Sequence, residues 1–193
     1  MPREPRAEHE PGLYHVFARG NRKAPIYADD RDRRKYLDML GRVTRRMRWR
    51  CLGYCLMGNH MHLIIETVEP NLGSGMHRLQ GGFAQYFNRR HGFVGHLFQD
   101  RFNAVLVKSD AQLWAVCAYV ARNPVKAGLC ATPEQWAWSS HAAVIRGLCP
   151  SWLDRERLFA YFRADGGDPL TRYTELINFA ALTLPLDKGD SPL

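Results

Sequence analysis

The stretch RCLGYCLMGNHMHLIIE, residues 50–66, contains two apolar runs that are separated only by Gly58 and Asn59. The runs, residues 50–57 and 60–66, are short and rich in apolar side chains, as strands are. A two-residue connection between two strand-like runs is typical of a tight β-hairpin. We therefore predict two antiparallel strands here, and the other elements follow on either side.

Upstream of this hairpin, residues 14–19 alternate between two faces before Gly20 and Asn21, which predicts a first strand closed by a turn. From Asp30 an acidic cluster leads into apolar residues at helical spacing with arginines between them, which predicts an amphipathic helix with a basic outer face. The apolar positions of this helix are Tyr36, Leu37, Leu40, Val43 and Met47.

Downstream of the hairpin, the spacing of apolar residues predicts a second amphipathic helix over 76–87. An aromatic-rich loop then leads into a fourth predicted strand over 102–106. A third helix is predicted after Ser109 and Asp110, a pair typical of helix N-caps. Its buried stripe is expected to consist of Leu113, Val116, Cys117 and Val120.

The predicted order is strand, helix, strand, strand, helix, strand, helix. This is the α+β, ferredoxin-like β-α-β-β-α-β pattern, an antiparallel sheet with helices on one face, plus a further helix and a mostly helical C-terminal extension. The open face of such a sheet is a frequent nucleic-acid platform. We expect a flexible N-terminus over residues 1–11, a main domain over 12–149, a helical extension over 150–183 and a flexible tail over 184–193.

The chain of 193 residues carries 27 lysines and arginines against 19 acidic residues, a net charge of +8. The excess lies in residues 1–149, which hold a net charge of +10, whereas residues 150–193 hold −2. Arginine dominates the first helix, and its guanidinium group matches the geometry of phosphate oxygens. Nucleic acid is therefore the expected partner, with a solvated basic surface that binds nothing as the alternative.

Composition also bears on the compartment. No apolar stretch approaches the roughly 20 residues that span a bilayer, and the N-terminus lacks an apolar leader segment, so we expect a cytoplasmic protein outside membranes. The five cysteines, an odd number without a C-x-x-C pair, disfavour a disulfide framework and a zinc ribbon. Cys51 and Cys55, four apart on a predicted strand, are expected to share a face as reduced, buried thiols.

His60 and His62 are the first candidate ligands. On a strand, residues two apart project to the same side, so both imidazoles are expected to face one point while Met61 faces the other side. Two nitrogen donors on a rigid element are the beginning of a metal site, although a histidine pair at this spacing also arises by chance.

The third helix supplies two more candidates. Tyr119 and Asn123, four apart, share a helix face away from the buried stripe. Pro124 disfavours helical geometry at the residue before it, so Asn123 is predicted at the helix end, where its side chain can turn toward a neighbour. The alternative is structural: a half-buried tyrosine with a solvated hydroxyl, and an asparagine that caps the helix.

Two motifs together resemble a known family. The His-Met-His of residues 60–62 resembles the His-hydrophobe-His signature of single-strand DNA nucleases, and YVARNPVKAGL, residues 119–129, resembles the tyrosine-bearing helix of single-tyrosine transposases. Their combination resembles the REP-associated tyrosine transposases, relatives of the smallest insertion-sequence enzymes. Further matches at RGNR (19–22), LFQDRF (97–102) and WAWSS (136–140) extend the resemblance over about residues 12–145.

The resemblance implies a metal-dependent DNA transposase or endonuclease. It implies that His60, His62 and Asn123 hold one divalent ion, Mg²⁺ or Mn²⁺, although the same donors would suit zinc. It further implies that the Tyr119 hydroxyl attacks a phosphodiester, giving a 5′-phosphotyrosine and a free 3′-OH, so that strands are rejoined without ATP. The base stays open between a metal-bound hydroxide and a histidine such as His15, which is more simply interpreted as a structural strand residue.

The implied partner is single-stranded or hairpin DNA of the REP-palindrome type. Side chains expected to contact its phosphates are Arg19, Arg22, Lys23, Arg45, Arg46, Arg89, Arg90 and Arg101. Phe93, Phe98 and Phe102 are candidates for stacking on bases, with core packing as the alternative. The WAWSS stretch is expected to be structural and to attach the extension to the sheet.

Two other functions remain compatible with these motifs. One is a hairpin-DNA or RNA binding protein without turnover, and the other is a rolling-circle initiator or relaxase-type nickase, which usually has a longer chain. The resemblance allows a monomer or a homodimer, in which Tyr119 completes the histidine site of its own subunit or of the partner.

Overall fold

The computed structural model describes residues 10–163 and 167–183, with side chains up to residue 179. Its strands form one antiparallel sheet in the order β2-β3-β1-β4. The predicted hairpin is confirmed, because β2 and β3 pair around Gly58 and Asn59 with Cys55 opposite His62. The strands are β1 Gly12–Arg19, β2 Arg50–Leu56, β3 His60–Thr67 and β4 Asn103–Leu106.

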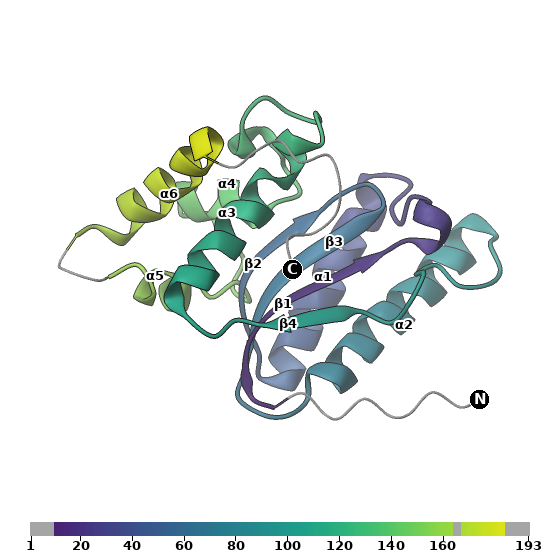
Figure 1. The fold of residues 1–193 in the computed structure, drawn as a ribbon. Helices are drawn as coiled ribbons and strands as arrows, with labels where there is room; N and C mark the ends of the chain where they lie inside the picture. Colours follow the sequence, from purple (N-terminus) through teal and green to yellow (C-terminus); the bar gives the residue numbers. More distant parts are fainter. Residues whose placement is uncertain (1–9, 164–166, 184–193) are drawn as a thin grey trace.

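Helices cover both faces of this sheet (Figure 1). α1 and α2 pack against each other behind the sheet in that view, whereas α3 lies on the other face against β2 and β3, together with the C-terminal helices. The ferredoxin-like α+β fold is confirmed, but the expected open face is reduced to the part formed by β1 and β4. The helices are α1 Asp30–Met47, α2 Leu72–His91, α3 Asp110–Lys126, α4 Ser140–Arg146, α5 Arg155–Ala160 and α6 Pro169–Thr183, with short 3-10 turns η1 Asn21–Lys23 and η2 Pro133–Gln135.

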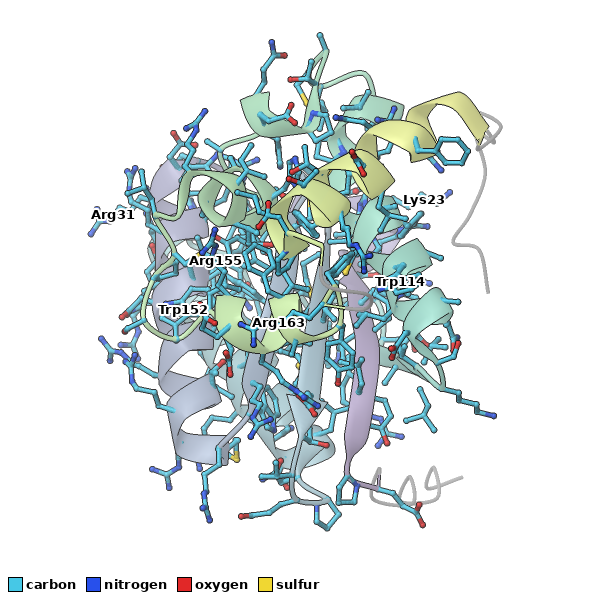
Figure 2. The ribbon with its side chains drawn as sticks, turned by 90° about the vertical axis from the view of Figure 1, so that its left-hand side faces the viewer. Lys23, Arg31, Trp114, Trp152, Arg155 and Arg163 are labelled. Atoms are coloured by element: carbon cyan, nitrogen blue, oxygen red, sulfur yellow. The ribbon has the colours of Figure 1, made fainter. Side chains whose placement is uncertain are left out.

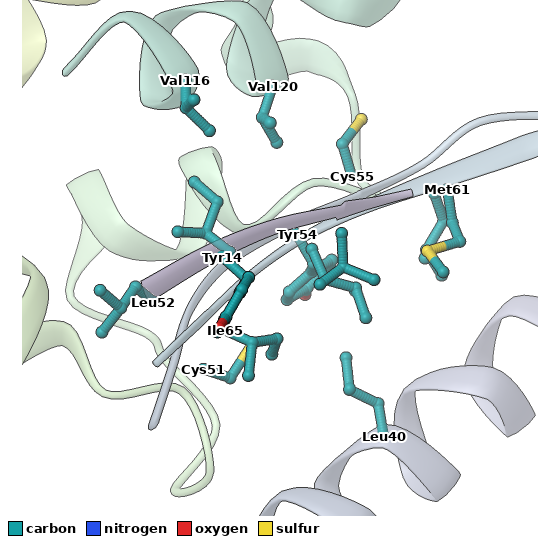
Figure 3. Packing of buried hydrophobic residues seen from close by; sticks show 14 of the residues in the cluster. Tyr14, Leu40, Cys51, Leu52, Tyr54, Cys55, Met61, Ile65, Val116 and Val120 are labelled. Atoms are coloured by element: carbon teal, nitrogen blue, oxygen red, sulfur yellow. The ribbon is translucent and has the colours of Figure 1, made fainter. Parts of the chain in front are cut away.

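Buried side chains alternate between two cores, one on each face of the sheet. Figure 3 shows Met61 and Ile65 of β3 on the side of Leu40 in α1, and Val116 and Val120 of α3 on the opposite side. The buried stripe predicted for α3 is confirmed, since all four of its residues are buried. The α3 side of β3 is therefore the side on which His60 and His62 lie.

β2 contains a β-bulge. The pairing register shifts between Cys51 and Gly53, so Cys51 lies opposite Ile65 whereas Cys55 lies opposite His62. One extra residue reverses the side to which the following side chains point, and the two thiols lie on opposite faces (Figure 3). The prediction of a shared face is therefore wrong. Both cysteines are free and buried, and burial raises the pKa of Cys51 to about 12, which keeps it protonated.

The outer edge of β2 is covered by the segment 136–154. The Leu56 N–H donates to the Trp138 carbonyl oxygen over 2.9 Å, and the Tyr54 N–H donates to Ser140 Oγ over 2.9 Å. Exposed strand edges invite pairing with other chains, and this segment removes that possibility at β2. The WAWSS stretch lies within it, in a structural position.

The C-terminal helices are attached through side chains as well. Arg157 of α5 forms two 2.7 Å hydrogen bonds to the carboxylate of Glu66, and Trp114 Nε1 of α3 donates to the Tyr161 carbonyl oxygen over 3.1 Å. In Figure 2, α5 lies between Trp152, which packs beside α1, and Trp114. The boundary at residue 149 stays a prediction.

The predicted flexible ends lie largely outside the described residues, which begin at residue 10 and stop at residue 183. Within the described part of the chain, no helix is both long and apolar enough to cross a bilayer.

Candidate active site

The histidine pair stands at the beginning of β3. His60 and His62 point to the same side of the strand, opposite Arg19 and Phe17 of β1, as the spacing predicts. Their ring centroids are 5.1 Å apart in an edge-to-face arrangement. His62 is only 3% exposed, whereas His60 is partly accessible at the strand end. The pair therefore has one buried member and one member at the edge of solvent.

α3 continues through Asn123 and Pro124 to Lys126, so the prediction that the helix ends at Asn123 is wrong. A proline removes one backbone hydrogen bond, but in the final turn little of the helix follows it, and the Ala127 N–H still donates to the Asn123 carbonyl oxygen over 3.0 Å. Asn123 therefore keeps helical geometry one turn after Tyr119, and both side chains reach the histidines.

Asn123 lies between the two imidazoles. Its Oδ1 is 3.2 Å from His60 Nε2, and its Nδ2 is 3.3 Å from His62 Nε2. Asn123 is buried, as a side chain that bridges a helix and a strand must be. The structure thus brings Asn123 to two histidines that lie 63 and 61 positions before it in the sequence.

A second layer of hydrogen bonds orients both rings. His15 Nε2 lies 3.1 Å from His62 Nδ1, and Asn59 Oδ1 lies 2.7 Å from His60 Nδ1. Because Asn123 Nδ2 is a donor, His62 Nε2 must accept, which places the ring proton on Nδ1 and makes Nδ1–H donate to His15. The remaining nitrogen of His62 therefore presents a lone pair toward Asn123.

Burial lowers the pKa of all three histidines. The pKa of His62 falls well below its ordinary value because of burial, with further lowering by His15, His60 and Arg19. Burial alone lowers the pKa of His15 to about 4. For His60, burial lowers the pKa, its hydrogen bond to Asn123 opposes this, and Arg19 adds to the lowering. The rings are therefore uncharged at neutral pH, the form that binds metal ions.

The donor set fits a divalent cation. Both ring nitrogens of His60 face amide oxygens, from Asn59 and Asn123, yet a neutral imidazole has a single N–H. An ion held by His60 Nε2, His62 Nε2 and Asn123 Oδ1 would remove this mismatch. Within the described residues, no group of three or more histidine, cysteine, aspartate and glutamate side chains is placed to hold a metal. Such a site therefore depends on the amide as its third donor.

Tyr119 lies beside these donors. Its ring centroid is 5.3 Å from that of His62, edge to face, and 5.9 Å from that of His15. Lys126, two turns later on α3, places its ammonium nitrogen 5.5 Å from the centroid of the tyrosine ring. Tyr119 lines a pocket of about 370 Å³, and His60 and His62 form part of the same wall. The lining residues are Phe17, Ala18, Arg19, His60, His62, Gln99, Asp100, Arg101, Asn103 and Tyr119.

Four of the predicted DNA-contacting residues lie near this pocket. Arg19 and Arg101 line it. Arg22 and Lys23 are exposed in η1, which is joined to the site because Asn59 Nδ2 donates to the Lys23 carbonyl oxygen over 3.0 Å. The cations therefore continue from the pocket along one end of the sheet.

The other predicted cations lie elsewhere. Arg45 and Arg46 are exposed at the C-terminal end of α1, on the opposite face and near the start of β2, about 20 Å of strand away from the end that carries His60. Arg90 pairs with the carboxylates of Asp29 and Asp32, so its charge is already compensated. The remaining member, Arg89, is exposed in the last turn of α2.

The aromatic candidates divide in a similar way. Phe98 and Phe102 belong to the core, which favours the packing alternative for these two residues, whereas Phe93 is exposed. Gln99 and Asn103 also line the pocket, although the sequence did not lead us to expect them there. A signal was present, because both are polar positions beside the buried phenylalanines of the LFQDRF motif.

The sheet, the paired histidines and the helix that carries Tyr119 agree with the resemblance noted in the sequence, which is to transposase-like, DNA-processing proteins. The chain belongs to the IS200-like transposase family, whose model matches residues 11–123. The matched range includes both histidines, Tyr119 and Asn123. Membership of this family implies a DNA-processing enzyme.

The fold is also found in a solved structure. The chain is similar to a REP-associated tyrosine transposase bound to a REP hairpin, at 21% identity and a TM-score of 0.61, over 78% of this chain and 89% of that chain. At this identity the likeness concerns the fold. A Deinococcus radiodurans R1 protein provisionally assigned as a transposase is 13% identical over 59% of this chain and 92% of its own, with a TM-score of 0.43, too low to carry an argument. No curated protein matches the chain in sequence.

Proposed function

We propose that this protein cleaves and rejoins single-stranded or hairpin DNA, with Tyr119 as the nucleophile and a divalent ion at His60, His62 and Asn123. The observation that carries the proposal is the placement of the Tyr119 ring 5.3 Å from that of His62, in a pocket lined by arginines. A nucleophile, a donor set for an ion and phosphate-binding cations are the parts that phosphodiester transfer requires.

The ion, Mg²⁺ or Mn²⁺, would polarise the scissile phosphate when bound. The Tyr119 oxygen attacks phosphorus, so an O–P bond to tyrosine forms while the bond to the 3′ oxygen breaks. The phenol loses one proton and the released 3′ oxygen gains one. The product is a 5′-phosphotyrosine, whose reversal by another 3′-OH rejoins strands without ATP.

His15 serves this reaction as a positioning residue and not as the base. Its Nε2 is already engaged by the His62 Nδ1–H at 3.1 Å, and it is only 3% exposed. With Nε2 accepting from His62, the single proton of a neutral His15 ring lies on Nδ1, so neither ring nitrogen has a free lone pair for the tyrosine proton.

The DNA path we propose runs along the end of the sheet that carries the pocket. Arg19 and Arg101 contact phosphates at the pocket, and Arg22 and Lys23 extend the path along η1. Arg90 is left out of this path, because it pairs with the carboxylates of Asp29 and Asp32. Hairpin DNA of the REP type is the proposed substrate, supported by the REP hairpin in the solved structure of similar fold.

The test is adduct formation with labelled single-stranded hairpin DNA from repeats that flank the gene, in Mg²⁺, Mn²⁺ or EDTA. We expect a denaturation-resistant protein–DNA adduct that requires metal and disappears in Tyr119→Phe. Tyr86→Phe is the matched control, because the Tyr86 hydroxyl lies on α2 without a hydrogen-bond partner. DNA binding without an adduct in any metal would instead identify a binding protein.

A further inference from the structure

The loop that follows α2 exposes two apolar side chains at its tip. Phe93 is 59% exposed and Val94 is 100% exposed. A fully exposed valine beside an exposed phenylalanine keeps apolar surface in water, and adjacent exposures of this kind mark interaction sites more often than single ones do. The loop, residues 92–96, is therefore a candidate interaction site.

The loop is held in one shape from below. Asn88 contacts the loop through both its backbone and its side chain. Its backbone carbonyl oxygen accepts from the Phe93 N–H over 3.0 Å, and its side-chain Nδ2 donates to the Gly95 carbonyl oxygen over 2.9 Å. Gly92 and Gly95 have φ values of 70° and 101°, which only glycine adopts at low cost. The Phe93 ring also stacks on Phe87 at 5.9 Å. The conformation of the loop that carries Phe93 and Val94 is thus fixed by hydrogen bonds, glycine geometry and ring stacking.

The segment that directly follows this loop pairs with the start of the basic turn η1. The Asn21 N–H donates to the Leu97 carbonyl oxygen over 2.8 Å, and Gly20 and Phe98 form an antiparallel bridge. Arg22 and Lys23 follow directly, and both have left-handed φ values, 53° and 59°. Side-chain-bearing residues in this conformation are strained, and such strain concentrates at functional sites. An apolar tip and two exposed cations therefore share one edge of the molecule.

The chemistry of this edge suits nucleic acid. Asp29, the N-cap of α1, and Asp32 in its first turn are paired with Arg90, so they do not compensate the charges of the exposed cations of η1. Cations bind phosphates, and an apolar side chain between them is the arrangement that separates neighbouring bases. The edge is also continuous with the pocket, because the Gln99 N–H donates to the Arg19 carbonyl oxygen over 3.0 Å.

We propose that the 92–96 loop is a wedge that holds open the junction between the stem of a DNA hairpin and its single-stranded foot. Val94 sits against the last base pair, Phe93 supports it, and Arg22 and Lys23 bind the phosphates on either side of the opened step. The inference rests on the proposed function, since it assigns a role toward the same DNA. The inference adds that the protein itself opens the end of the duplex, so the DNA need not be open there before it binds.

The test reads base-pair opening without cleavage, in the full chain carrying Tyr119→Phe. The probe is a DNA hairpin with a single-stranded 5′ foot and 2-aminopurine in the closing base pair, whose fluorescence rises when the base unstacks. We expect the rise on binding to be lost in Val94→Ser and kept in Val94→Leu, with hairpin Kd weakened about tenfold by the serine. The effect on a linear single strand should be smaller.

Leu148→Ser is the control, because Leu148 is 75% exposed at the end of α4 and should leave the fluorescence rise intact. The wedge proposal would be overturned if the fluorescence rise were equal with and without Val94→Ser in the Tyr119→Phe chain. It would also be overturned if the Tyr119→Phe chain bound the hairpin without any fluorescence rise. Adduct formation by the wild-type chain is measured separately, so loss of the wedge and loss of the tyrosine chemistry are told apart.

Discussion

At the scale of single residues, the candidate site is notable for the absence of carboxylate from its donor set. His62 is oriented by another imidazole, His15, where a carboxylate often serves, and the third donor is the amide of Asn123. A divalent ion held by these neutral groups would keep its full charge toward a phosphodiester. The cost is weaker intrinsic binding, which makes the orientation of each ring more important.

The first prediction follows from that orientation. His15→Leu removes the acceptor of the His62 Nδ1–H, so the ring of His62 loses its fixed tautomer and Mn²⁺ affinity should fall about 10- to 100-fold. Isothermal titration with Mn²⁺ measures this without any DNA. His15→Gln offers an amide acceptor and should recover part of the loss.

His77→Leu is the control, because His77 is an exposed histidine on α2 and its loss should leave Mn²⁺ binding unchanged. If His15→Leu binds Mn²⁺ as tightly as the wild type, the positioning role is wrong.

How far the sequence alone could lead is visible at these residues. It could be predicted that His60 and His62 share one face of a strand, and that Tyr119 and Asn123 share one face of a helix, because the periodicities of strands and helices are local. The pairing of Arg90 with Asp29 could not be, since the partners are 61 positions apart and an exposed arginine in a last helical turn has the same pattern. The sequence shows that residue 90 is an arginine, but not that two carboxylates lie beside it.

At the scale of elements, α2 shows how a glycine can be required by packing. A Cβ on Gly75 would come within 2.1 Å of the buried indole of Trp49, whereas a Cβ on Gly81 of the same helix would meet nothing within 4 Å. We predict that Gly75→Ala lowers the free energy of unfolding by about 1–3 kcal/mol through overpacking. Gly81→Ala should raise it by about 0.5–1 kcal/mol. Urea unfolding measures both, and equal effects would contradict the packing argument.

The start of α1 and the end of α2 are joined by a charged cluster. Asp32 is fully buried, and although burial raises its pKa, hydrogen bonds from the Ala28 N–H, Arg90 and His91 lower it by more. A carboxyl whose pKa is lower in the folded state stabilises the fold above its unfolded pKa, about 3.8, and this contribution is lost as the pH falls through the folded pKa. The cluster should therefore make the fold acid-sensitive.

We predict that Arg90→Leu lowers the urea midpoint at pH 7, because it leaves the buried Asp32 carboxylate without its cation. The loss should shrink as the pH falls through the folded pKa of Asp32, below which the carboxyl is protonated in both proteins. Arg89→Leu, at the exposed neighbouring position, should change the midpoint little across this pH range. A loss that does not depend on pH would show that Arg90 acts through packing alone.

Elements also show why some features escaped prediction. The hairpin at Gly58 and Asn59 is specified by its own residues, but the bulge at Leu52 depends on what packs on each side of β2. The helical geometry of Asn123 likewise depends on tertiary contacts that outweigh the local effect of Pro124.

At the scale of the whole molecule, residues 12–149 and the C-terminal helices share one buried cluster. Ile177 of α6 is fully buried, whereas its neighbour Asn178 is exposed. We predict that Ile177→Ala costs about 2–5 kcal/mol and shifts a single unfolding transition, seen alike by tryptophan fluorescence and far-UV circular dichroism. Asn178→Ala should shift it little. Two separate transitions would mean that α6 unfolds on its own.

The covered edge of β2 has a consequence for the order of events on the ribosome. β1 to β3 can pair once residue 67 has emerged, but the outer hydrogen bonds of β2 need partners as late as residue 154. At about 5–20 residues per second, translation of the roughly 90 residues between them takes about 4 to 18 seconds. During that time the outer edge of β2 is unpaired in each nascent chain. Because a polysome holds several such chains close together, neighbouring copies can pair through their β2 edges before the covering segment has been made.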